Sequence, residues 1–294
     1  MSTRPASPSR TTAQVLSLAC AIAMPGVSDA LAAQDRAPHS QVFIAPPHPV
    51  GARRFLSAPP SSAAQAAPGA FSVGLRHGDV LKLGGMAAGA LLIATADRRG
   101  DAWARRPGVQ DDATLRRLSR AGDLTGTWVA TGIGPTLWLL GRARGDSGTA
   151  VMGLRTTEAV AASGAVISAI KLLAGRTRPY ASPDHSPAHW DFLGGLNSDS
   201  TRSFASGHSA LAAAAAATLA VEWRRQGRSG WKTVGPPLVY ALAAMTAGSR
   251  VRDRKHWLSD VVSGSAIGML GAISVRRWHD AHPGNRLDRA LLSR

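Results

Sequence analysis

Three short stretches of the sequence place basic residues and histidines at spacings that could hold and attack an anion. They are KLLAGRTRP, which starts at Lys171, SFASGH, which ends at His208, and SRVRDRKHWLSD, which runs from Ser249 to Asp260. The chemistry shared by ammonium, guanidinium and imidazole groups is the recognition of phosphate-like anions. Each stretch alone has an ordinary explanation, such as a capped helix or a solvated charged turn. The same theme repeated three times indicates a site.

The first stretch predicts two cations at the end of a helix. Lys171 lies in the apolar run AVISAIKLLAG, where a charge is costly unless something compensates it. Arg178 follows seven residues later, about two helical turns, so both side chains are predicted to point to one side. Pro179 disfavours helical geometry at Arg178, which predicts that the helix ends there.

The second stretch predicts an anion-binding helix start. Ser206 is a suitable N-cap, and Gly207 lets the backbone approach a ligand closely. The free N–H groups of a first helical turn form a natural anion site. His208 stands in the same turn, where it could exchange a proton with a bound group.

The third stretch predicts an oriented histidine. Arg250 is expected to end one helix and His256 to begin the next, with Asp260 one turn further along the same face. A carboxylate so placed orients the imidazole and leaves its other nitrogen free as a nucleophile. The other charged residues of this stretch are predicted to face water or an anionic surface: Arg252, Asp253, Arg254 and Lys255.

The elements that must position these residues are helices. Apolar segments rich in Ala alternate with charged loops, and β-branched alternation is too sparse for strands. The segments are Val80–Ala96, Leu124–Gly141, Thr157–Gly175, Ser206–Trp223, Pro236–Gly248 and Trp257–Val275. Six such helices predict an all-α bundle in one domain.

The flanking regions differ in composition from this helical part. Residues 1–33 read as a signal peptide, with Arg4 and Arg10 before the apolar run AQVLSLACAIAM. Residues 34–78 read as a linker rich in Pro, Ala and Ser, residues 79–280 as the helical domain, and residues 281–294 as a basic C-terminal tail. The one cysteine, Cys20, lies in the predicted signal, so disulfides are not expected in the mature chain.

The charge of the chain indicates an anionic partner. The formal net charge is +16, which favours nucleic acid, a membrane surface or a phosphorylated substrate. The arginines are scattered over several loops and no nucleic-acid-binding module is recognisable, which argues against nucleic acid. The expected partners are therefore a phosphorylated small molecule or a lipid phosphate, with a membrane surface as a further possibility.

The three stretches resemble the signature of the type 2 phosphatidic acid phosphatase and vanadium haloperoxidase superfamily. That signature is Lys, six residues, Arg-Pro; then Pro-Ser-Gly-His; then Ser-Arg, five residues, His, three residues, Asp. Ten of its eleven fixed positions match here, in the same order. The departure is Ala205, where the family usually has Pro, and the expected consequence is a less rigid loop.

The resemblance implies a fold and a role for each residue. It implies a six-helix core and a metal-independent phosphohydrolase that cleaves phosphate monoesters or pyrophosphates through a phosphohistidine. His256 would be the nucleophile, Asp260 would accept a hydrogen bond from its other ring nitrogen, and His208 would be the general acid. The implied phosphate-binding residues are Lys171, Arg178, Ser206, Gly207 and Arg250. No metal or cofactor is expected, and vanadate would bind as a phosphate mimic.

Two other functions and two locations stay open at this point. A vanadium-dependent haloperoxidase would use the same cradle, although the short catalytic region favours the phosphatase. A lipid-binding envelope protein with a decayed site fits less well with the intact His–His–Asp set. If a signal is cleaved and six helices span the membrane, the three stretches fall on the cytoplasmic side, whereas exported phosphatases of this type usually act outside. A soluble or peripherally attached domain removes this conflict. The chain is therefore predicted to be exported to the periplasm or cell envelope, with an integral inner-membrane lipid phosphatase as the alternative.

Overall fold

The fold is built from helices alone over the residues that the computed structural model describes, 77–227 and 230–292. The predicted signal, and all of the predicted linker except its last two residues, lie outside this range. The helices are α3 (His77–Ala94), α4 (Asp97–Ala104), α5 (Pro107–Gln110), α6 (Ala113–Leu124), α7 (Ala130–Arg144), α8 (Ser147–Ala174), α9 (Gly207–Arg225), α10 (Trp231–Arg252), α11 (Leu258–Ala281) and α12 (Arg286–Leu292). No strand occurs within the described residues, and the all-α prediction is confirmed.

The apolar segments predicted as helices are all helical, but several helices have other bounds. Helices α10 and α11 extend beyond the predicted segments, and the segment predicted as Leu124–Gly141 is divided between the Thr125–Val129 π-helix and α7. Helix α8 begins at Ser147 rather than Thr157, because the Asp146 carboxylate accepts the Thr149 N–H at 3.1 Å and caps a longer helix. The predicted C-terminal tail contains α12. The Trp138 indole N–H donates to the Leu291 carbonyl at 3.1 Å and holds α12 against the bundle.

Helix α9 lies at the centre and packs against α8, α10 and α11. Its run of alanines from Ala212 to Ala217 is buried, and such small side chains let the neighbouring helices approach closely. The contact is tightest with α11, where a Cβ at Gly264 or Gly268 would overlap the carbonyl oxygen of Ser206 or Ala210. The glycines of α11 therefore set the distance between these two helices.

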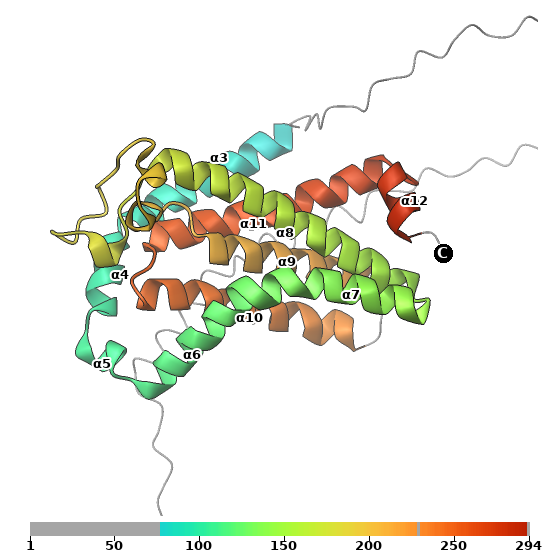
Figure 1. The fold of residues 1–294 in the computed structure, drawn as a ribbon, viewed down its shortest axis with the longest axis horizontal. Helices are drawn as coiled ribbons and strands as arrows, with labels where there is room; N and C mark the ends of the chain where they lie inside the picture. The colour runs from blue at the N-terminus through green and yellow to red at the C-terminus, as the bar shows by residue number, and fades with distance from the viewer. Residues whose placement is uncertain (1–76, 228–229, 293–294) are drawn as a thin grey trace, which may run out of the picture.

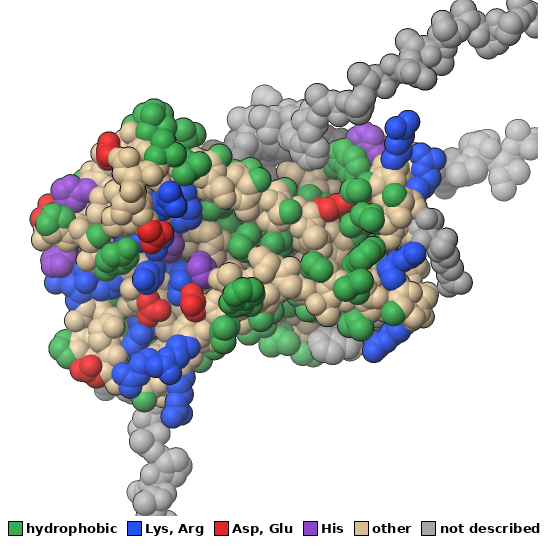
Figure 2. Space-filling view, viewed as in Figure 1, with side chains coloured by type: hydrophobic (Ala, Val, Ile, Leu, Met, Phe, Trp, Pro, Cys, Tyr) green, Lys and Arg blue, Asp and Glu red, His purple; other side chains and the backbone are tan. Residues whose placement is uncertain are grey.

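The chain brings several helix ends together at one end of the bundle, on the left of Figure 1. Helices α8 and α10 end there, α9 and α11 begin there, and α4 lies across the same end. Gly175, in the left-handed conformation with φ of 59°, ends α8 and turns the chain into the 176–206 segment that covers this end. Figure 2 shows Lys, Arg and His side chains gathered over the same region.

Arg252 and Arg254 were predicted to face water, but they instead connect the end of α10 and the loop after it to the α4–α5 region. The Arg254 Nε donates to the buried Asp101 carboxylate at 2.7 Å. Arg252 is buried and donates from Nη2 to the Gln110 carbonyl at 2.8 Å. The prediction was wrong for both arginines because α4 and α5 fold back over them, whereas Lys255 is exposed as expected.

Two described helices, α8 and α11, are long and apolar enough to cross a membrane by length and composition. The apolar window of α11 is mostly buried in the bundle, as in the core helix of a soluble protein, whereas that of α8 is mostly exposed. These two helices are weak evidence for a membrane.

The close α9–α11 contact predicts a stability effect. Gly268→Ala should lower the free energy of unfolding by about 1–3 kcal/mol, because the added methyl group forces the two backbones apart. The matched control is Gly132→Ala in α7, where the space beside the glycine is open and the substitution should be neutral or slightly stabilising. Chemical denaturation of both variants measures the difference, and equal stability of the two would contradict the packing described here.

Candidate active site

The residues of the three stretches converge at the end of the bundle where α9 and α11 begin. The Ser206 backbone N–H donates to the Asp260 carbonyl at 2.9 Å and joins the second stretch to the third. A Cβ at Gly207 would lie 3.6 Å from Lys171 Cε, which places the first stretch beside the second. The structure thus brings together residues that are widely separated along the chain.

His256 is buried and held in a single tautomer. Its Nδ1 lies 2.6 Å from the Ser203 carbonyl oxygen, which can only accept, so Nδ1 carries the proton and Nε2 keeps a free lone pair. Burial lowers the pKa of His256 to about 4, against the opposing pull of Asp260. The ring is therefore neutral over most of the pH range and has the form that a nucleophile requires.

The hydrogen bond predicted between His256 and Asp260 is not made directly. Asp260 Oδ2 lies 3.8 Å from His256 Nδ1, beyond hydrogen-bond reach. The reason is that His256 lies before α11, which begins at Leu258, rather than one turn below Asp260 on its face. Ser203 bridges the two residues, since its carbonyl accepts from His256 and its hydroxyl donates to Asp260 Oδ2 at 2.5 Å.

Asp260 is fully buried and its carboxylate is satisfied by several donors. The Trp257 N–H donates to Oδ2 at 2.9 Å, and Arg176 Nη1 donates to Oδ1 at 2.5 Å. Burial by itself would raise the pKa of Asp260, but His256, Arg176 and Ser203 hold it below its ordinary value. Asp260 is therefore a permanent negative charge close to the His256 ring.

His208 lies in the first turn of α9 and is half-exposed, as a residue that meets a ligand must be. Its Nε2 is 2.7 Å from Thr127 Oγ1 and 3.1 Å from Asp123 Oδ1. Burial lowers the pKa of His208 to about 4, Arg250 adds to this effect, and Asp123 opposes it. A ligand with a double negative charge in the same place would favour the protonated ring.

Three cations surround this position, and each is held by a carbonyl or a carboxylate. Lys171 Nζ donates to the Arg202 carbonyl at 2.7 Å, and Arg178 donates to the carbonyl and carboxylate of Asp199 at 2.9 Å. Arg250 Nη1 lies 2.8 Å from Asp123 Oδ1. Burial, followed by the charge of Arg178, lowers the pKa of Lys171 to about 8.

The loop rather than the helix positions Arg178. Helix α8 ends at Ala174, and Arg178 is in the extended conformation before Pro179, so the predicted two-turn helical spacing from Lys171 does not apply. Arg178 reaches the site because its backbone N–H donates to the Ser200 carbonyl at 2.8 Å. The charge of Arg178 still contributes to lowering the pKa of Lys171, His208 and His256, so it lies near all three.

The start of α9 supplies the remaining part of the cradle. Ser206 caps the helix, and its Oγ accepts from the Ser209 N–H at 3.4 Å and from the Ser209 hydroxyl at 2.9 Å. Gly207 has no side chain to cover the first-turn N–H groups, which favour an anion at this end of the helix. Ala205 is fully buried beside Ile167 and Ala210, so apolar contacts fix the entry to the helix.

Several residues of this site were not predicted from the sequence. Ser203, Asp123 and Thr127 contact the two histidines, while Arg176 and Asp97 lie behind Asp260. Arg176 and Ser203 lie within the motif stretches, but their residue types and spacing do not predict a role for them. Asp97, Asp123 and Thr127 carry no local signal, because only the packing of α4, α6 and the Thr125–Val129 π-helix brings them to the site.

The site residues lie in a part of the chain that matches a known protein family. Residues 153–283 match the PAP2 superfamily, a range that contains all eight predicted site residues. A lipid A 1-phosphatase of Porphyromonas gingivalis is 39% identical over 80 residues, which are 26% of this chain and 17% of that protein. The chain thus aligns with about a sixth of the length of this relative. No solved structure gave a significant match. The part of the chain that carries the converging histidines and cations thus matches the PAP2 superfamily.

Proposed function

We propose that this chain is a phosphohydrolase that transfers a phosphoryl group to His256 and then to water. The observation that carries the proposal is the His256 ring, which is buried and neutral, with Nδ1–H donated to Ser203 and Nε2 free. The adjacent cations Lys171, Arg178 and Arg250 suit the three equatorial oxygens of a phosphoryl group in its transition state. The match to the PAP2 superfamily supports the same class of reaction.

The first half of the reaction forms a phosphohistidine. His256 Nε2 attacks phosphorus while the bond to the leaving oxygen breaks, and protonated His208 gives its proton to that oxygen. The imidazole ring gains positive charge as the P–N bond forms, and the nearby Asp260 carboxylate stabilises it. The Ser203 carbonyl keeps the Nδ1 proton in place throughout this step.

The second half regenerates the protein. Water attacks phosphorus, neutral His208 accepts one of its protons, and the P–N bond breaks to release inorganic phosphate and neutral His256. The side chains already present supply the nucleophile, the acid and base, and the positive charges. We therefore propose that the reaction proceeds without a metal or an organic cofactor.

The rim of the site supports an amphiphilic substrate. Trp128 is 74% exposed and Leu196 is 60% exposed. Trp128 follows the His208 contact Thr127, and Leu196 follows Gly195, which packs on the backbone of Lys171. Exposed apolar groups beside a phosphate cradle favour a lipid phosphate over a small ester, and the relative is named for a lipid phosphatase. Parallel assays with a lipid phosphate in detergent and a water-soluble ester distinguish the two substrate classes.

We propose an exported location in the periplasm or cell envelope, with the integral inner membrane as the alternative. The exposed apolar face of α8 supports contact with lipid, whereas the burial of α11 is that of a core helix. Carbonate extraction of a membrane fraction should release the chain if it is peripherally attached. Retention in the pellet would instead show that helices span the bilayer.

Removal of the nucleophile should abolish turnover. His256→Ala is expected to lower kcat for p-nitrophenyl phosphate by at least about 10³-fold, because no other group forms the covalent intermediate. EDTA should leave the parent activity unchanged, and vanadate should inhibit it. The matched control is His282→Ala, an exposed histidine beyond the far end of α11, which should retain parent activity. Substantial hydrolysis by His256→Ala would refute the assignment, and bromide oxidation with vanadate and peroxide would indicate a haloperoxidase.

The pH dependence should differ between kcat/KM and kcat. In the free protein the pKa values of His256 and His208 are both about 4. Since His256 must be neutral and His208 protonated, kcat/KM should be greatest at acidic pH and fall as His208 loses its proton. A bound phosphoryl dianion raises the pKa of His208, so the alkaline limb of kcat should lie at higher pH than that of kcat/KM. Coincident limbs would contradict this role for His208.

A further inference from the structure

Arg176 is buried beside Asp260, and hydrogen bonds and aromatic rings hold its guanidinium group on several sides. Its guanidinium donates from Nη1 to Asp260 Oδ1 at 2.5 Å, from Nη1 to Ser259 Oγ at 2.8 Å and from Nε to the Pro187 carbonyl at 3.1 Å. Its Cζ lies 4.8 Å and 5.5 Å from the ring centroids of Trp190 and Trp257. A planar guanidinium held this way has one orientation, so Asp260 is fixed as well.

Asp97, the first residue of α4, completes the group. Its Oδ2 accepts from Arg176 Nη2 at 2.7 Å and from the Ser259 hydroxyl at 2.6 Å, and its Oδ1 accepts from the Ser259 N–H at 2.8 Å. The Asp97 side chain has no solvent exposure. It therefore joins α4 to the first turn of α11 at Ser259, the residue before Asp260.

The charges of this group do not cancel. Two carboxylates, Asp97 and Asp260, share the one guanidinium of Arg176, which leaves a net charge of −1 in a buried position. Without Asp97 the Arg176–Asp260 pair would be neutral. Asp260 brings this group next to the ring, with its Oδ2 3.8 Å from His256 Nδ1, the nitrogen opposite the free Nε2. The surplus negative charge can therefore stabilise the positive charge that the ring gains on attack.

We propose that Asp97 and Arg176 are positioning residues for the nucleophile, which fix Asp260 and supply the net negative charge that His256 needs when it attacks phosphorus. The inference rests on the role proposed above for His256. It extends the functional unit to α4, outside the range that matches the PAP2 superfamily. A purely structural ion pair would affect stability and leave the chemistry of His256 unchanged, and the experiment must separate these two effects.

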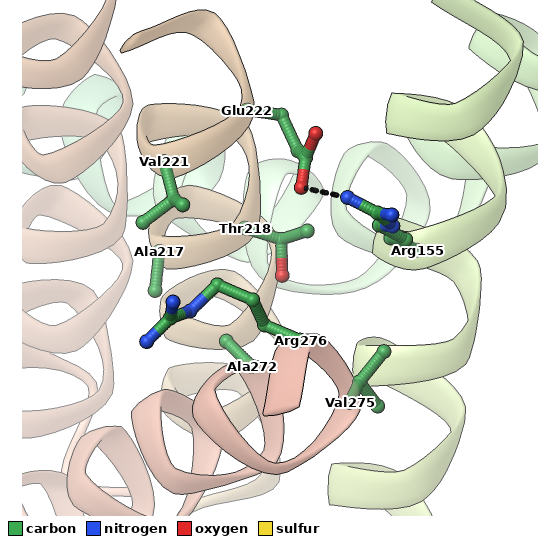
Figure 3. Close-up of a pocket in the computed structure, with 8 residues that line it drawn as sticks. All are labelled: Arg155, Ala217, Thr218, Val221, Glu222, Ala272, Val275 and Arg276. Carbon is green, nitrogen blue, oxygen red and sulfur yellow. Dashed lines mark hydrogen bonds and ion pairs between the residues drawn. The ribbon is translucent and has the colours of Figure 1, made fainter. Parts of the chain in front are cut away.

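The chain offers a matched control at the opposite end of the bundle. Glu222 is buried and accepts from Arg155 Nη1 at 2.8 Å beside a small pocket, as Figure 3 shows. It lies fifteen residues after Gly207 on α9, about 22 Å along the helix. Glu222→Gln breaks a buried ion pair, as Asp97→Asn does, but far from His256.

The first measurement compares kinetics in the full chain, with the folded fraction of each variant determined in parallel. Asp97→Asn should lower kcat roughly 10- to 100-fold, by analogy with the loss of the hydrogen-bonding partners that orient metal-binding histidines. Its KM and the inhibition constant of inorganic phosphate should stay within about twofold of the parent, because the phosphate-binding cations are untouched. Arg176→Lys should retain more activity than Arg176→Met, and Glu222→Gln should keep parent kcat. Equal kcat in Asp97→Asn and Glu222→Gln would overturn the inference.

The second measurement does not depend on turnover. The Nδ1 proton of His256, assigned by its loss in His256→Ala, should give a downfield NMR resonance because it is buried and hydrogen-bonded to Ser203. The resonance should shift or broaden in Asp97→Asn and stay in place in Glu222→Gln. If the parent chain hydrolyses no phosphate ester, the proposed function fails while this result still decides whether Asp97 positions His256. An unchanged resonance in Asp97→Asn would overturn the positioning role.

Discussion

The rest of the site depends on the hydrogen bonds and the ion pair that satisfy the buried carboxylate of Asp260. A charge without solvent contact is tolerated only when donors satisfy it, and here those donors come from Arg176, Ser203 and Trp257. They belong to three segments: the loop after α8, the approach to α9 and the start of α11. Satisfying one carboxylate therefore fixes the relative positions of these segments, and with them the ring of His256.

The cations of the site likewise need partners of opposite charge. Lys171, Arg178 and Arg250 lie close enough together to lower the pKa of nearby histidines, and their repulsion has to be offset when no anion is bound. Asp199 and Asp123 provide that offset through direct contacts with Arg178 and Arg250. Both carboxylates are more than half exposed, so an entering phosphoryl group can displace them at modest cost.

The sequence was sufficient to predict the helices and most of the converging residues, because motif residues at helix ends meet when the helices pack side by side. The spacing of the residues was a less reliable guide to their hydrogen bonds. The spacing from His256 to Asp260 suggested one helical turn, but α11 begins at Leu258 and Ser203 takes the hydrogen bond. Asp97 and Asp123 could not be predicted, since each is an ordinary acidic residue until tertiary packing places it against Arg176 or Arg250.

The central claim is that His256 carries the phosphoryl group, and the most direct test is to trap that intermediate. Without a general base, His208→Ala should still react with p-nitrophenyl phosphate, whose leaving group needs little protonation, but should hydrolyse the intermediate slowly. Rapid quenching at alkaline pH followed by peptide mass spectrometry should then find phosphate on His256, and none in the double variant that also carries His256→Ala. Steady turnover by His208→Ala with phosphate on another residue, or on none, would contradict the account.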